Sequence, residues 1–241
     1  MRLKESCDNL KFPQLTLTQS QTRLKPIIFN TDMVRAILDE RKTVTRRIVK
    51  DLSEAAHYPM GISEEDGKFE FMCGGVSNGI AADWIEAVNM PYGFGDILYV
   101  RETWEFIPWC DVDYFCGRCT KEMIGTGIFK YRADDPSKDQ PSGWRPSIHM
   151  PKEAARIFLR VTDVRVEQLQ DITIADCKRE GVVLPPLRGD EYDYELDPDL
   201  DYLFGFQNLW DSTIKPKDID KYGWNGNPWV WVIEFERIEK P

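Results

Sequence analysis

Apolar residues recur at helical spacing between Asn30 and Glu40, where they lie three and four positions apart. This pattern predicts a short amphipathic helix with Asn30 or Thr31 as its N-cap, since both side chains can accept a hydrogen bond from the first turn. The apolar residues 27–29, directly before it, are typical of a short strand. The β-branched residues of RKTVTRR (41–47), directly after it, favour extended chain.

Strands are also predicted in three segments further along the chain, one of which, from Ile157, alternates apolar and polar residues. The segments are ILYVRETW at 97–104, residues 157–166 with a bend, and the final segment Trp229–Ile238. Side chains on a strand alternate between its two faces. In the final strand, one buried face is therefore expected to carry Trp231, Ile233 and Phe235.

Two more helices are predicted between these strands. Thr173 and Asp176 of TIAD resemble a capping box, so a short helix is expected to follow Thr173 and to end at Gly181. A second amphipathic helix is expected over residues 200–210, after the acidic stretch 190–201. Short strands joined by short helices predict an α+β domain built on a mostly antiparallel sheet or a small barrel.

The 241 residues suit one domain, but some segments break the pattern. Residues 51–92 and 105–143 are mixed in character and rich in turn signals, so we interpret both as insertions. Residues 1–25 are polar with little periodicity, and we interpret them as an N-terminal extension. One domain with these two insertions would then occupy residues 26–241.

Composition and charge limit the partners. With 42% hydrophobic and 12% aromatic residues, the chain has the composition of a globular protein. Its longest apolar run, 229–233, cannot span a bilayer, and its N-terminus lacks the apolar core of a signal peptide, so we expect a cytoplasmic protein with no membrane partner. The net charge of −10 opposes the broad basic face that long duplex nucleic acid needs. A small ligand or a short single-stranded RNA fits better.

The first candidate site is the basic cluster after the first helix, in which Thr43 and Thr45 lie among Arg41, Lys42, Arg46 and Arg47. A hydroxyl becomes a nucleophile when a neighbouring base takes its proton, and lysine can be that base if burial or nearby cations lower its pKa. Lys42 and Thr45 share one side only if the chain bends between them. The alternative is a solvated helix end, where basic residues are favoured by the helix dipole.

Glu180 is the second candidate, because it ends a predicted helix, where the dipole disfavours a carboxylate. Local rules broken in this way are enriched at functional sites.

The cysteines are the third candidate. CDVDYFCGRC (110–119) holds a CxxC pair and a further cysteine, a spacing that aims thiolates at a tetrahedral zinc ion. We expect a structural zinc that pins the two insertions together, with the ligands Cys73, Cys110, Cys116 and Cys119. The alternative is ordinary reduced thiols.

Taken in order, these motifs resemble the ASCH-domain family, which has a PUA-like barrel fold. The resemblance rests on the first helix, RKTVTRR, GFGDILYVRETW, VTDVRVEQLQDITIADCKREGV and NPWVWVIEFERI. With WRPSIHMP included, the chain from about Pro26 to Lys240 is similar to longer ASCH proteins of bacteriophages and prophages. The resemblance implies an α+β fold with a small PUA-like barrel. Glu40 stands where the family pattern usually has glycine.

The resemblance also implies a function. In small ASCH proteins that hydrolyse 4-acetylcytidine, the catalytic residues match Lys42 as base, Thr45 as nucleophile or water-positioning hydroxyl, and Glu180 as proton relay. It therefore implies an amidohydrolase acting on a modified nucleoside without a catalytic cofactor. Substrate binding would fall to Arg41, Arg46 and Arg47. Since the family includes suspected RNA-binding modules and a ribonuclease type, the alternatives are a module that binds RNA or a modified base, or a ribonuclease, using the same cleft.

Overall fold

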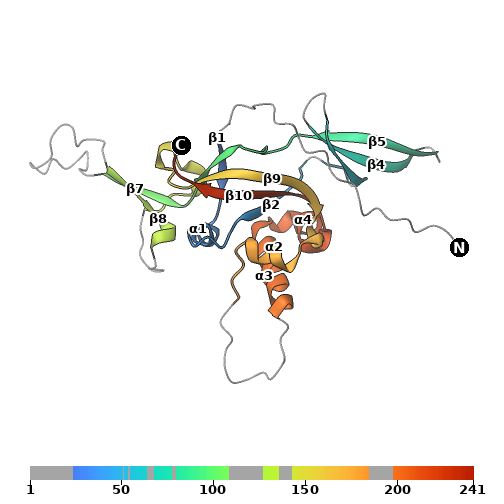
Figure 1. The fold of residues 1–241 in the computed structure, drawn as a ribbon. Helices are drawn as coiled ribbons and strands as arrows, with labels where there is room; N and C mark the ends of the chain where they lie inside the picture. The colour runs from blue at the N-terminus through green and yellow to red at the C-terminus, as the bar shows by residue number, and fades with distance from the viewer. Residues whose placement is uncertain are drawn as a thin grey trace, which may run out of the picture.

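The expected α+β class is confirmed, because the described residues form β-sheets together with a few α-helices (Figure 1). The computed structural model describes residues 24–50, 52–53, 55–63, 68–77, 80–108, 127–135, 143–184 and 198–241. In these ranges, no helix is both long and apolar enough to cross a bilayer.

The main sheet has five strands in the order β1-β6-β9-β10-β2. They are β1 (Leu24–Ile28), β6 (Ile97–Arg101), β9 (Phe158–Gln168), β10 (Trp229–Ile238) and β2 (Val44–Ile48). β1 pairs with β6 in parallel, and the other neighbours are antiparallel. β1 and β2 are the two edges, so the described strands do not close into a barrel.

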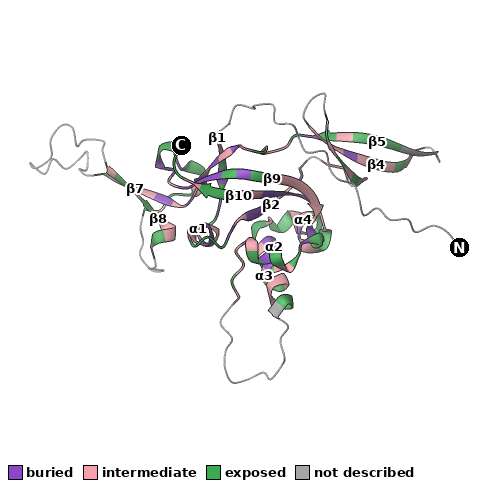
Figure 2. Cartoon of the chain, in the orientation of Figure 1, coloured by how far each residue is buried: buried purple, intermediate pink, exposed green. Residues whose placement is uncertain are grey.

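Side chains of β10 alternate between two buried clusters. The first cluster includes Phe29 and receives the predicted set Trp231, Ile233 and Phe235, so the prediction that these three share a buried face is confirmed. Val230 and Val232 point to the opposite face and pack with Phe206 in the second cluster. The sheet is therefore covered on both faces around β10, which Figure 2 draws largely as buried.

Three of the four α-helices of the described residues form where caps and patterns predicted helices, whereas the last of the four was not predicted. Asn30 caps α1 (Thr31–Leu38) by accepting a hydrogen bond from the Met33 N–H at 2.9 Å. Thr173 caps α2 (Ile174–Arg179) by accepting from the Asp176 N–H at 3.2 Å. The later helices are α3 (Pro198–Thr213) and α4 (Ile219–Tyr222), and α2 and α3 lie together beside β2 and β10 (Figure 1).

The first expected insertion contains a sheet that the turn signals did not predict. Its three antiparallel strands are β3 (Ala56–Ile62), β4 (Phe69–Ser77) and β5 (Ile80–Val88). Phe71 and Cys73 of β4 are buried in the same cluster as Phe29, so this sheet packs onto the main core. In the second expected insertion, β7 (Trp104–Pro108) pairs with β8 (Gly127–Tyr131).

Candidate functional site

Lys42 and Glu180 meet inside the protein although 138 positions separate them in the sequence. The Lys42 ammonium nitrogen Nζ lies 2.5 Å from the Glu180 carboxylate oxygen Oε2. The same ammonium donates a hydrogen bond to the backbone carbonyl of Glu180 at 2.9 Å. Their side chains are 0% and 4% exposed, so the two charges form a desolvated ion pair.

The turn after α1 brings Lys42 to this position. Glu40 adopts φ 59°, in the left-handed region that favours glycine. The N–H groups of Arg41 and Lys42 then both donate to the Ala36 carbonyl, at 2.9 and 3.0 Å. The chain therefore folds back under the end of α1 before it enters β2 at Val44.

The end of α2 supplies the other half of the pair. The Thr43 N–H donates to the Arg179 carbonyl at 2.9 Å, which ties the turn after α1 to this helix end. Gly181 ends α2 with φ 85°, and a Cβ there would lie 2.7 Å from Ala36 Cβ and 3.2 Å from Lys42 Cβ. A glycine is needed here both for its conformation and for the close approach of the two segments.

Arg46 holds the second oxygen of the Glu180 carboxylate. Its side chain is 0% exposed, and Nη1 lies 3.3 Å from Glu180 Oε1. Its Nη2 contacts Asp176 at 2.9 Å and Glu167 at 3.1 Å. Its guanidinium carbon also lies 5.9 Å from the centre of the Phe206 ring. Glu180 is thus held between two buried cations, one at each oxygen.

A wider charge network surrounds Arg46 on the face of the sheet covered by α2. Arg165 of β9 and Arg179 of α2 both contact Glu234 of β10, at 2.5 and 2.6 Å. Hydrogen bonds from Arg179, and then from Arg165, lower the pKa of Glu234. Sequence reasoning missed these residues, because their pairing depends on the register of β9 with β10 and on the position of α2. Period-two alternation of Arg165 and Glu167 was the available signal.

The other two predicted cations are also engaged. Arg47 donates a hydrogen bond to the Ile28 carbonyl at 2.9 Å, across the gap between β2 and β1, and lies 5.1 Å from the centre of the Phe29 ring. Arg41, 40% exposed, pairs with Asp39 at 3.0 Å and donates to the Gly181 carbonyl at 3.3 Å. Arg41, Lys42 and Arg46 thus contact carboxylates, whereas Arg47 contacts backbone carbonyls and an aromatic ring.

Burial lowers the pKa of Lys42, since the interior disfavours its charged form. The charge and hydrogen bond of Glu180 oppose this shift, while Arg47 and Arg46 add to it. A lysine in such surroundings can lose its proton closer to neutral pH than a free lysine.

Two cavities meet at Glu180. The larger, about 340 Å³, has Arg41, Gly181 and Val182 in its wall. The smaller, about 20 Å³, is lined by Thr45 and Arg46. Met33, Glu180 and Leu209 line both cavities. Thr45 is 1% exposed and lies on β2 opposite Ile233, so the structure brings Thr45, Arg46 and Glu180 to one small space, with Lys42 in contact with Glu180.

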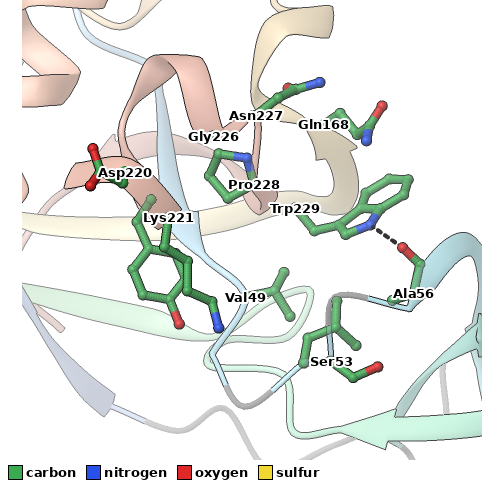
Figure 3. A pocket seen from close by; sticks show the side chains of 12 residues that line it. Val49, Ser53, Ala56, Gln168, Asp220, Lys221, Gly226, Asn227, Pro228 and Trp229 are labelled. Carbon is green, nitrogen blue, oxygen red and sulfur yellow. Dashed lines mark hydrogen bonds between the residues drawn. The ribbon is translucent and has the colours of Figure 1, made fainter. Parts of the chain in front are cut away.

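A cavity of about 560 Å³ lies elsewhere, between the chain after β2 and the segment that follows α4 (Figure 3). Trp229 forms one wall, and its indole N–H donates to the Ala56 carbonyl at 3.1 Å. Asn227 accepts a hydrogen bond from the Gln170 N–H at 2.8 Å. None of the predicted site residues lines this cavity.

The expected zinc ligands fall in different parts of the chain. Cys73 is buried in β4, and burial raises its thiol pKa. Cys110, Cys116 and Cys119 lie outside the described residues. Within the described ranges, no group of three or more potential ligands could hold a metal ion, so the zinc site stays a prediction.

Comparisons of this chain with family models, with curated proteins and with solved structures found no match.

Proposed function

We propose that the protein hydrolyses an amide on a modified nucleoside, of the 4-acetylcytidine type, at Lys42, Thr45 and Glu180. The observation that carries this proposal is the buried 2.5 Å contact between Lys42 Nζ and Glu180 Oε2, beside a cavity lined by Thr45. The ASCH resemblance of the sequence supports it. We also infer that the sheet is an open form of a PUA-like barrel, since Arg47 and α1 bridge its two edge strands.

The chemistry needs a base, a nucleophile and a group that returns a proton to the leaving amine. Lys42, with its lowered pKa, is suited to be the base. Glu180 lies within hydrogen-bond distance of Lys42 and lines both cavities, so it can relay protons between Lys42 and a ligand. None of these roles requires a metal ion.

The ligand would occupy the 340 Å³ cavity, whose volume lies in the usual range for small-molecule sites. Met33, Val182 and Leu209 give it apolar walls suited to a base or an acyl group. Arg35 also lines it, but this guanidinium donates to the backbone carbonyl of Ala133 at 3.0 Å. An uncharged, planar ligand fits this lining better than a polyanion.

The alternatives are an RNA-binding or modified-base-binding module and a ribonuclease. Both RNA functions would use the basic cluster to hold phosphate. Lys42 and Arg46 are already bound to carboxylates, so they would have to give up these partners first. This observation favours the hydrolase.

The test is release of free acid and nucleoside from 4-acetylcytidine and other N-acylated nucleosides, followed by mass spectrometry. Wild-type protein should turn over at least one of them, with or without a chelator. Lys42→Ala and Thr45→Ala should each lower kcat by roughly 100-fold or more. Lys25→Ala is the matched control, because Lys25 pairs with Asp96 at 2.7 Å away from the site. No release from any acylated nucleoside, with salt-sensitive binding of single-stranded RNA, would favour the binding module instead.

A further inference from the structure

The smaller cavity at Glu180 has the size and lining of a site for one water molecule. Its volume is about 20 Å³. A single water needs about 10–15 Å³ or more by this kind of measure, together with two to four polar partners. An acyl group or a nucleobase is far larger. The cavity can therefore admit water but not the ligand itself.

Polar groups that could hold this water come from β2 and the end of α2. The Arg46 Nε–H is buried and has no hydrogen-bond partner among the described residues, which is costly for a donor unless water satisfies it. The Thr45 hydroxyl can both donate and accept, and the Glu180 carboxylate can accept. All three residues line the cavity, together with Arg47 and Thr213. Met33, Phe206, Leu209 and Trp210 add apolar surface.

The position of this cavity relative to the larger one suggests its use. Met33, Glu180 and Leu209 line both, so a ligand in the 340 Å³ cavity and a water in the 20 Å³ cavity would approach the same carboxylate. The Lys42 ammonium contacts that carboxylate at Oε2, and Arg46 contacts it at Oε1.

We propose that a water molecule held between Thr45, Arg46 and Glu180 is the nucleophile of the proposed hydrolysis, and that Thr45 positions it instead of attacking. This inference rests on the proposed function. The water oxygen bonds to the amide carbonyl carbon, and its proton passes through Glu180 to neutral Lys42. The C–N bond then breaks, and Lys42 returns the proton through Glu180 to the leaving amine. The products are a carboxylic acid and the free amine, and the enzyme is unchanged.

Two measurements on the full-length protein test this inference. A high-resolution crystal structure of the ligand-free protein should contain one ordered water within hydrogen-bond distance of Thr45 Oγ1 and Arg46 Nε. Thr45→Val, which keeps the shape but removes the hydroxyl, should lose this water, while Thr45→Ser should keep it. In turnover assays, Thr45→Val should lower kcat by roughly 100-fold with little change in KM, and Thr45→Ser should stay within about tenfold of wild type.

Acid quenching during turnover of 4-acetylcytidine, followed by intact-protein mass spectrometry, gives the decisive chemical result. We expect no acetylated protein at any time. An acetyl group on Thr45, or no water in the cavity while turnover persists, would overturn the inference and leave the proposed function standing. If the crystal structure contains the ordered water but the protein hydrolyses no acylated nucleoside, the water site is real, and the proposal that this water is a nucleophile is overturned.

Discussion

Replacing Glu180 with glutamine tests whether its contact with Lys42 is a desolvated ion pair. Glutamine keeps the shape of the side chain but removes the charge that lies 2.5 Å from Lys42 Nζ and 3.3 Å from Arg46 Nη1. Both cations have side chains that are 0% exposed, so bulk water cannot fully replace the lost carboxylate. The free energy of unfolding should therefore fall.

The expected loss can be bounded from the partners that remain. Removing one member of a buried pair typically costs about 3–5 kcal/mol. Arg46 keeps Asp176 and Glu167, and Lys42 keeps the backbone carbonyl of Glu180, so we expect the lower end, about 3 kcal/mol near pH 7. For a domain of this size that corresponds to a decrease in Tm of roughly 6–12 °C.

The sign of the pH dependence follows from Lys42. Burial lowers its pKa below the ordinary value of 10.5, so the unfolded chain holds more protons between the lowered value and 10.5, and stability rises with pH across that window. Glu180 raises the pKa of Lys42, so Glu180→Gln should lower it further and extend the window downward. The difference in the free energy of unfolding between wild type and Glu180→Gln should shrink as the pH rises, because Lys42 then becomes neutral in both proteins.

Urea unfolding at several pH values, with a double-mutant cycle, measures these quantities. Lys42→Met with Glu180→Gln should cost less than the sum of the single variants, with a coupling of about 2–3 kcal/mol. Glu236→Gln is the control, since the Arg160–Glu236 pair has a similar 3.0 Å contact but side chains 52% and 54% exposed, and should cost below about 1 kcal/mol. Two results would refute the interpretation of this contact as a desolvated ion pair: a loss of unfolding free energy below about 1 kcal/mol for Glu180→Gln, or a loss that grows with pH.

Three further predictions follow from the same region. Gly181→Ala should displace Lys42, because a Cβ there would lie 2.7 Å from Ala36 Cβ. It should cost about 1–3 kcal/mol more than Gly95→Ala, which is also at positive φ but has open space and therefore carries only the backbone strain. Equal losses of Tm in the two variants would contradict this. Burial raises the pKa of Cys177 to about 11, so its thiol should resist alkylation at about pH 8 in the native protein and react after unfolding, as peptide mass spectrometry can measure. The proposed hydrolysis should accelerate with pH and level off below 10.5 as Lys42 loses its proton, and Lys42→Arg should abolish the activity; a flat pH–rate profile would exclude Lys42 as the base.

Strands and helices were predictable where a local rule acted alone. β10 was predicted with its bounds, Trp229–Ile238, because aromatic and β-branched residues fill most of this segment. The β3–β5 sheet was missed, although Phe69, Phe71 and Cys73 alternate in β4. Irregular pairing of β3 with β4, with register shifts on both sides of Tyr58 and Pro59, leaves β3 without a regular alternation. The alternation in β4 therefore had no matching pattern in the segment before it.

The sequence singled out Lys42 and Glu180 but not the charge partners that the structure gives to Arg46. Glu180 stood out because the helix dipole disfavours a carboxylate at a helix end, and Lys42 stood out because it lies among arginines next to two threonines. Arg46 was expected to bind substrate, yet its side chain is 0% exposed and contacts three carboxylates. Its partners Asp176 and Glu167 lie on α2 and β9, more than 100 positions away, so only the folded register reveals the pairing.

The carboxylates that contact Lys42 and Arg46 affect which ligand the site can accept. A phosphate placed about 4 Å from the Glu180 carboxylate would be repelled by about 4 kcal/mol at an effective dielectric constant of about 20, which corresponds to roughly a thousandfold in affinity. Lys42 and Arg46 do not remove this repulsion, because these two cations already contact three carboxylates, those of Glu180, Asp176 and Glu167. A neutral amide avoids the repulsion in the bound state. It acquires negative charge only as water attacks, so the site admits an amide more readily than a phosphate in the ground state.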